Sequence, residues 1–127
     1  MIDRTTDSRR LALLVEDSLV NQKLLTHLLN GGGFDVVLAV NGQEAFDKFK
    51  QQSFDVVIMD VQMPIMDGLE ATRLIRQHEK EEVGGTPIVG VTAGIDRDSC
   101  ISAGMNDYLA KPVHAPDFHE VLERWCA

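Results

Sequence analysis

Short apolar runs alternate with amphipathic segments five times along this 127-residue chain, and this alternation limits the possible folds more than any other feature. The run at 56–59 is continuous, largely β-branched and ends in Asp60, which is typical of a strand buried on both faces. Strands that alternate with helices form a parallel sheet with right-handed crossovers and helices on both sides. The expected strands are 11–15, 34–40, 54–60, 88–92 and 107–111.

The segments between these runs carry helix signals. Ser18 is a suitable N-cap for a helix with leucines at 24, 25, 28 and 29, and the glycines at 31–33 end it. Asn41 and Gly42 form a turn or cap before the next helix. The charged stretch at 77–83 is expected to be the solvated tail of the helix that begins at 67, and residues 84–87 are expected to end that helix. A second helix is expected over 43–51, and a third begins at 67. A fourth is expected over about 96–103, and a fifth over about 116–125, with Phe118 and Trp125 in the core.

Length and composition indicate one soluble domain. Residues 10–127 are long enough to bury a core, while residues 1–9 have no hydrophobic period and are expected to be a flexible tail or linker. The net charge of −8 disfavours nucleic-acid binding. No apolar stretch approaches the ~20 residues that cross a bilayer, and the polar start is no secretory signal. No membrane insertion is expected for this reason. Two distant cysteines, Cys100 and Cys126, suggest reduced thiols and a cytoplasmic protein.

Polar side chains follow or end four of the expected strands. Glu16 and Asp17 follow the first strand, and Asp60, Thr92 and Lys111 end the third, fourth and fifth. The carboxyl ends of parallel strands share one edge of a sheet, so these groups are expected to converge there. Clustered carboxylates repel unless a cation lies among them, and hard oxygen ligands suit Mg²⁺. With a lysine and a hydroxyl around one exposed carboxylate, the site is suited to accept a phosphoryl group on Asp60.

Four separated motifs resemble the receiver domains of response regulators in two-component signalling. The similarity covers about 10–125 and is strongest to receivers attached to hybrid sensor histidine kinases. The resemblance implies a flavodoxin-like (βα)5 fold with strand order 2-1-3-4-5. The motifs are Val15-Glu16-Asp17-Ser18, Met59-Asp60-Val61-Gln62-Met63-Pro64-Ile65-Met66-Asp67-Gly68, Val91-Thr92-Ala93 and Asp107-Tyr108-Leu109-Ala110-Lys111-Pro112.

The resemblance also implies a role for each matching residue. Asp60 accepts the phosphoryl group, and Lys111 and Thr92 contact the phosphoryl oxygens. Thr92 and Tyr108 form the switch that moves on phosphorylation, and the Lys111–Pro112 peptide bond is cis. The metal ligands for Mg²⁺, or Mn²⁺, are Glu16 through water, Asp17, Asp60 and the main-chain carbonyl of Gln62.

The implied partner is a sensor histidine kinase or a histidine phosphotransfer domain that supplies a phosphohistidine. The domain is then a phosphoacceptor that catalyses only its own phosphorylation and dephosphorylation. It signals through the surface of its fourth helix, fifth strand and fifth helix. A homodimer is possible. The chain is expected to come from a hybrid kinase or larger regulator, with a stand-alone response regulator as the alternative.

The chain departs from the family pattern between Thr92 and Lys111. This stretch is about three residues shorter than in the receivers it resembles, and the shortage falls between Ala93 and Asp98. The shortening is not expected to affect the carboxylates or Lys111. It does put in question whether the domain signals through the surface of its fourth helix, fifth strand and fifth helix. Gly94, two residues after Thr92, leaves access to the phosphoryl group open.

Three other functions are compatible with this fold class. A flavodoxin-like cofactor binder needs a glycine- or hydroxyl-rich phosphate cradle after the first strand, where Glu16 and Asp17 stand instead. A magnesium-dependent phosphatase needs a second acid after its nucleophile, and Val61 and Gln62 offer none. A receiver-shaped interaction module that never takes phosphate stays open. The four histidines, His27, His78, His114 and His119, have no ligand partner at useful spacing and are expected at the surface.

Overall fold

The computed structural model describes residues 9–79, 85–94 and 97–126, and its core is a five-stranded parallel sheet in the order β2-β1-β3-β4-β5. Every residue of β3 and β4 is buried, as their continuous apolar runs require. The predicted fold class and strand order are confirmed. The strands are β1 (Arg10–Val15), β2 (Phe34–Ala39), β3 (Val56–Asp60), β4 (Ile88–Thr92) and β5 (Asp107–Ala110).

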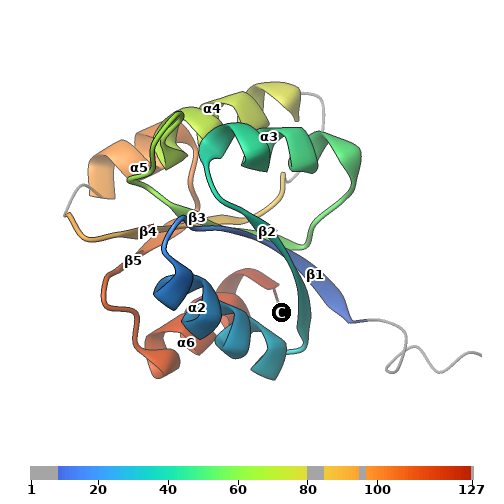
Figure 1. Ribbon diagram of the computed structural model, residues 1–127, viewed down its shortest axis with the longest axis vertical. Coiled ribbons are helices and arrows are strands. Elements are labelled where there is room, and N and C mark those ends of the chain that lie inside the picture. Colours follow the sequence, from blue (N-terminus) through green and yellow to red (C-terminus); the bar gives the residue numbers. More distant parts are fainter. Residues whose placement is uncertain (1–8, 80–84, 95–96, 127) are drawn as a thin grey trace, which may run out of the picture.

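Helices cover both faces of the sheet (Figure 1). Two of them, α2 and α6, pack on one face, and α3, α4 and α5 pack on the other. The predicted limits agree with the observed ones to within one or two residues, except at the end of α4. That helix was expected to continue as a charged tail to 83, but it ends at His78, with Glu79 as its C-cap. The helices are α2 (Leu19–Gly31), α3 (Gly42–Gln51), α4 (Gly68–His78), α5 (Arg97–Ala103) and α6 (Ala115–Cys126).

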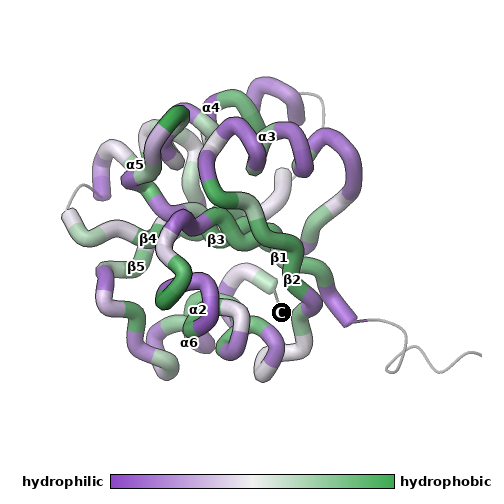
Figure 2. The backbone as a smooth tube through the Cα atoms, viewed as in Figure 1, coloured by the Kyte–Doolittle hydropathy of each residue, from purple (hydrophilic) through white to green (hydrophobic). Residues whose placement is uncertain are grey.

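Alternate residues of each central strand point to opposite faces of the sheet and belong to two separate hydrophobic cores. Leu14 and Ile58 face α2 and α6, where Phe118 is fully buried. Leu13 and Val57 face the helices of the opposite layer. Hydrophobic residues are concentrated in the strands, while polar residues mark the outer sides of the helices (Figure 2).

Side-chain caps fix where three helices begin, and each helix start lies next to the carboxyl edge of the sheet. Ser18 accepts a hydrogen bond from the Asn21 amide and caps α2, as predicted. Asn41 caps α3 and Asp67 caps α4 in the same way. These caps determine where the loops after β1, β2 and β3 end.

The expectation that the charged stretch after α4 is solvated is wrong at Glu79. Glu79, in the stretch expected to be solvated, is only 5% exposed, because its carboxylate accepts hydrogen bonds from Arg76 and from the Thr86 amide. Of the four leucines that predicted α2, three are buried and Leu24 is 40% exposed. The four histidines are exposed, as predicted.

Some predictions fall on residues that the structure does not describe. These are the tail at 1–8, residues 80–84 at the expected end of the charged helix tail, and residues 95–96 in the shortened region after β4. Within the described ranges, none of the helices has the length and apolar character needed to cross a membrane.

Candidate functional site

The strand ends bring the predicted polar residues together at one edge of the sheet. Glu16 follows β1 directly, and its amide donates to Ala39 O at the end of β2. Asp60 is the last residue of β3 and lies in register with Val91 of β4. The Lys111 amide, just after β5, donates to Thr92 O at 2.8 Å. The backbone ladder therefore places these side chains side by side, as the sequence predicted.

Three carboxylates form the centre of the site. Oxygens of Glu16, Asp17 and Asp60 lie within 4.8 Å of one another. Glu16 is fully buried and Asp17 is exposed. Burial raises the pKa of Glu16, and the nearby Asp60 charge raises it further, while the Ser18 amide and the Lys111 ammonium act in the opposite direction.

Lys111 supplies the positive charge next to two of these acids. Its Nζ lies 3.2 Å from Asp60 Oδ1 and 3.4 Å from Glu16 Oε1. The lysine side chain is only 22% exposed, so solvent screens these contacts less than it screens a surface pair. The Lys111–Pro112 peptide bond that follows is cis.

Two buried oxygens of the cluster lack hydrogen bonds. Glu16 Oε1 and Asp60 Oδ2 have no hydrogen-bond partner among the described residues, although Oε1 is close to the Lys111 ammonium. Buried carboxylate oxygens are costly without a partner. Hard anionic oxygens that converge in this way fit a divalent cation such as Mg²⁺.

The carboxylate of Asp60 is more enclosed than the sequence suggested. An exposed carboxylate was expected, but Asp60 is only 2% exposed. It is enclosed because β3 is central, Lys111 lies against Oδ1, and the Gln62 amide donates to the same oxygen at 3.2 Å. The main-chain carbonyl of Gln62 remains a predicted metal ligand.

Thr92 and Tyr108 occupy neighbouring strands near the site. Thr92 is buried, and its Oγ1 accepts a hydrogen bond from the Gly94 amide at 3.0 Å. Tyr108 of β5 is half-buried, pairs with Gly90 of β4 and packs against the core under α4 and α5. The sheet therefore connects the two predicted switch residues through adjacent strands.

Sequence reasoning missed two residues that support the site. Gln22 is buried on α2 and donates to Glu16 O at 2.7 Å, which fixes the backbone of that acid. Gly68 packs so closely on the backbone of Asp60 that any Cβ would overlap the Asp60 carbonyl oxygen. The Asp67-Gly68 pair signalled a helix start, but nothing in the sequence indicated this close approach.

A cavity of about 430 Å³ opens beside the cluster. Gln62, Thr92 and Gly94 line its polar side, and Met63 and Leu69 are part of its apolar wall. Val61 and Gln62, the two residues that follow Asp60, also line it, so the cavity lies close to the end of β3.

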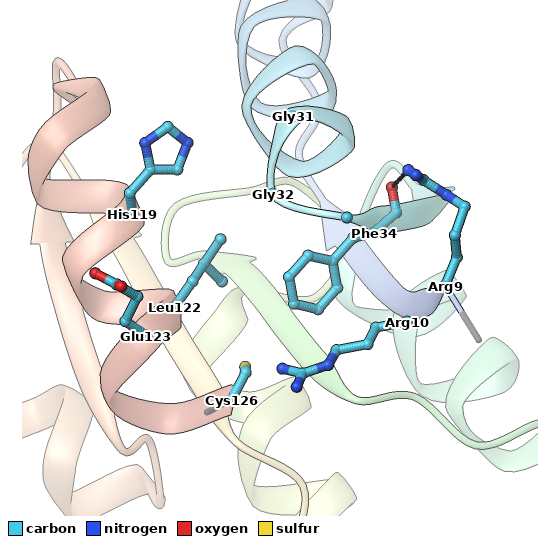
Figure 3. Close-up of a pocket in the computed structure, with 10 residues that line it drawn as sticks. Arg9, Arg10, Gly31, Gly32, Phe34, His119, Leu122, Glu123 and Cys126 are labelled. Atoms are coloured by element: carbon cyan, nitrogen blue, oxygen red, sulfur yellow. Dashed lines mark hydrogen bonds between the residues drawn. The ribbon is translucent and has the colours of Figure 1, made fainter. Parts of the chain in front are cut away.

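A second cavity, of about 790 Å³, lies elsewhere, between α6, the end of α2 and the start of β1 (Figure 3). Phe34, Leu122 and Cys126 are among the residues that line it, and Arg9 is held by a 2.9 Å bond to the Phe34 carbonyl. Burial raises the pKa of the Cys126 thiol. The cavity is far from the carboxyl ends of the strands, so it is not part of the acidic site.

The comparison with known proteins identifies the family. A sequence model of the family described as "Response regulator receiver domain" matches residues 12–123, which is most of the chain. The chain belongs to this family. The prediction of a receiver domain of two-component signalling is therefore confirmed.

The relatives include hybrid kinases. Hybrid signal transduction histidine kinase I of Dictyostelium discoideum is 41% identical over 118 residues, which cover 87% of this chain. The match spans only 7% of that kinase's length. This receiver domain thus resembles one small part of a much longer protein, as the motifs predicted.

Solved structures share the fold and give two points of reference. The receiver domain of sensor histidine kinase PA1611 from Pseudomonas aeruginosa PAO1 is 39% identical, with a TM-score of 0.83 and coverage of 92% of this chain and 97% of that one. That structure has a magnesium ion coordinated in its active site cleft. The receiver domain of Ssk1 from Saccharomyces cerevisiae, solved with the histidine phosphotransfer protein Ypd1, is 31% identical, with a TM-score of 0.86 and coverage of 93% and 89%.

Proposed function

We propose that Asp60 is the phosphoacceptor of this receiver domain and takes its phosphoryl group from a phosphohistidine on a partner protein. The observation that carries the proposal is the placement of one ammonium group, Lys111 Nζ, 3.2 Å from Asp60 within a cluster of three acids. Such a site combines an anionic nucleophile with charge neutralisation, which phosphoryl transfer needs.

The two oxygens of Asp60 have different roles in this proposal. Oδ1 is held by Lys111 and the Gln62 amide, whereas Oδ2 has no described partner. Oδ2 attacks phosphorus, so a P–O bond forms while the P–N bond to the donor imidazole breaks. The imidazole nitrogen keeps the electron pair and takes up a proton. Lys111 and the Thr92 hydroxyl stabilise the negative charge on the transferred phosphoryl oxygens.

Glu16, Asp17, Asp60 and the main-chain carbonyl of Gln62 would hold Mg²⁺, or Mn²⁺ in its place. When bound, the ion neutralises charge on the carboxylates and on the phosphoryl oxygens. The convergence of the carboxylates and the unpartnered oxygens of Glu16 and Asp60 support this assignment. The magnesium ion in the related Pseudomonas receiver supports it independently.

Exposed apolar residues around the same edge favour a protein donor. Leu19 and Val20 begin α2, Val40 follows β2, and Ile65 lies in the loop after β3, and all four are exposed. Exposed apolar groups around a functional site mark protein-binding surfaces. The partner is a histidine kinase or a histidine phosphotransfer domain, in line with the Ypd1 complex of the related receiver. Nucleic acid is disfavoured by the net charge of −8.

Phosphorylation would add roughly 1.5 to 2 negative charges and three acceptor oxygens next to Thr92 and Lys111. Thr92 moves toward them, Tyr108 follows, and the surface of α5, β5 and α6 changes. Couplings of this kind are worth about 1–3 kcal/mol, so the two states must lie close in free energy. A phosphoryl mimic should therefore shift the NMR signals between Thr92 and Tyr108, and unchanged signals would refute the switch.

The domain thus acts as a phosphoacceptor in the cytoplasm and catalyses only its own phosphorylation and dephosphorylation. We place it in a hybrid histidine kinase or a larger regulator, and the resemblance to the Dictyostelium kinase supports this. A stand-alone response regulator is the alternative. The mass of the native protein distinguishes the two, because a hybrid kinase or larger regulator is longer than the receiver domain.

The central test is incubation with acetyl phosphate and Mg²⁺, followed by intact mass spectrometry. Wild type should gain one phosphoryl group, and Asp60→Asn should gain none. Asp47→Asn, at an exposed position of α3, is the matched control and should be labelled like wild type. Excess EDTA should abolish labelling. If wild type stays unlabelled, or if Asp60→Asn is labelled equally, the chain is an interaction module instead of a phosphoacceptor.

A further inference from the structure

The loop from β3 to α4, residues 61–67, sets the orientation of the Asp60 carboxylate. The Gly68 amide donates to Val61 O at 2.9 Å and closes the loop at its base. Inside it, the Gln62 amide donates to Asp60 Oδ1 at 3.2 Å. This bond leaves Oδ2 as the oxygen without a partner. A shift of the loop would therefore move the group that orients the carboxylate.

The same loop holds an unfavourable backbone conformation. The Met66 amide donates to Pro64 O at 2.8 Å, so the residue between them, Ile65, is the centre of a γ-turn with a φ of +72°. A β-branched residue at positive φ is an outlier that costs free energy. Ile65 is 83% exposed, so burial of its side chain does not compensate. Such a conformation persists only where neighbouring structure holds it in place.

Gly42, at the start of α3, is the neighbour that contacts the outer part of this loop. Its amide donates to Met66 O at 2.9 Å. A Cβ at this position would lie 2.6 Å from Met66 O and 2.9 Å from Asp67 O. Both are main-chain oxygens, so a side-chain rotation cannot relieve the overlap. The φ of Gly42 is not positive, so its backbone conformation does not require glycine. Glycine is needed here because the main chain of the loop approaches so closely.

We propose that Gly42 is a positioning residue for the phosphorylation site, which it serves by holding the β3–α4 loop in its strained form. The chain of contacts runs from the Gly42 amide to Met66, through the closed loop to Gln62, and from the Gln62 amide to Asp60. This inference rests on the proposed phosphoacceptor function. It assigns α3 a role at a site to which that helix contributes no side chain.

The test compares Gly42→Ala with Gly31→Ala. Gly31, at the end of α2, is the matched control, because an added Cβ there meets nothing within 4 Å. Mg²⁺ affinity is measured by calorimetry, and the rate of acetyl phosphate labelling by intact mass. Gly42→Ala should weaken Mg²⁺ binding about tenfold or more, as loss of supporting contacts does at metal sites. Labelling should slow by a similar factor, and Gly31→Ala should match wild type in both.

Ile65→Gly provides a second arm, which still applies if Gly42→Ala fails to fold. Glycine accepts a positive φ freely, so the variant keeps the fold but loosens the loop. Its unfolding midpoint in urea should not fall, while Mg²⁺ binding should weaken several-fold. A purely structural role for the loop predicts the opposite pattern, with changed stability and unchanged Mg²⁺ affinity.

The outcomes separate this inference from the proposed function. If wild type is labelled and Gly42→Ala behaves like Gly31→Ala, the positioning role is refuted and the phosphoacceptor function stands. If wild type is never labelled but Gly42→Ala still weakens Mg²⁺ binding, the phosphoacceptor function fails and the positioning of the site stands. Wild type that binds no Mg²⁺ refutes both.

Discussion

Lys111 Nζ lies 3.2 Å from Asp60 Oδ1 and holds this buried carboxylate at the end of the central strand. The same ammonium group is 3.4 Å from Glu16 Oε1. One positive charge therefore faces two buried acids, with Asp17 close by. The cluster keeps a net negative charge, and this explains both its fit to a divalent cation and its dependence on Lys111.

Replacement of Lys111 by methionine should destabilise the protein without metal and increase its response to Mg²⁺. The substitution leaves two buried carboxylates without a counter-charge, and loss of one partner of a largely buried pair costs about 2–4 kcal/mol. Because Mg²⁺ binds only the folded state, it should raise the unfolding free energy of Lys111→Met more than that of wild type. Urea unfolding with and without Mg²⁺ measures both effects.

Lys23→Met is the control for this prediction. Lys23 is exposed on α2, so its loss should leave stability and the Mg²⁺ response close to those of wild type. Equal Mg²⁺ stabilisation of Lys111→Met and wild type would show that the ammonium group and the cation do not share a site.

Gly68→Ala should be destabilising because of the close approach between α4 and β3. An added Cβ would overlap the Asp60 carbonyl oxygen and lie 2.8 Å from Met59 Cγ. Overpacking of this kind costs about 1–3 kcal/mol, and the displaced Asp60 should also be phosphorylated more slowly. Urea unfolding measures the first effect, and acetyl phosphate labelling the second. Gly31→Ala, which has open space, should be neutral or stabilising by up to about 1 kcal/mol. A fully stable Gly68→Ala would contradict the packing argument.

The convergence of the acids, Thr92 and Lys111 could be predicted from sequence because it depends only on topology. Once five strands alternate with helices, their carboxyl ends must share an edge, whatever the loops do. The central strands could be predicted for the same reason, since continuous β-branched runs suit burial on both faces. These features are set by short segments of the chain, so local patterns suffice.

Features that depend on how separate segments meet in the folded chain could not be predicted. Glu79 lies in a charged stretch and is buried only because Arg76 and the Thr86 amide meet it in the fold. Gly42 and Gly68 have the sequence signature of ordinary helix starts. Their need to be glycine comes from carbonyl oxygens of other segments, which no local pattern reveals.

Asp107→Asn should lower stability at neutral pH by about 1–2 kcal/mol, as expected for loss of charge-assisted hydrogen bonds. Burial alone would raise the pKa of Asp107, but hydrogen bonds from the Trp125 indole, the Tyr108 amide and Arg124 together lower it below 3.8. The folded protein thus binds the carboxyl proton less tightly than the unfolded chain. The contribution of Asp107 is complete above pH 3.8 and is lost as the pH falls through the lowered value.

The difference in unfolding free energy between wild type and Asp107→Asn should therefore shrink in acid. Urea unfolding followed by Trp125 fluorescence over a pH series measures it. Asp47→Asn, which removes an ion pair of 3.9 Å at the surface, is the control and should differ little from wild type in unfolding free energy at neutral pH. A gap between Asp107→Asn and wild type that stays constant below pH 3.8 would contradict the lowered pKa.

The Ile65→Gly variant should have a higher free energy of unfolding than the Ile65→Ala variant, although proteins with alanine are usually more stable than those with glycine. Ile65 has a φ of +72°, where any residue with a Cβ is strained. Ile65→Gly should thus exceed Ile65→Ala in unfolding free energy by about 1 kcal/mol. This difference remains even though glycine makes the unfolded chain more flexible and so favours unfolding. Urea unfolding of both variants measures the difference.

Ile101 offers a control in which the opposite order is expected. It is also an exposed isoleucine, but it lies within α5, where glycine is less favourable than alanine by about 1 kcal/mol. Ile101→Gly should therefore be less stable than Ile101→Ala. Because both pairs compare the same two side chains, differences in hydrophobicity cancel and only the backbone conformation distinguishes the sites. The same order at both positions would mean that the loop beside Asp60 stores no strain, and Gly42 would then have no strained conformation to hold.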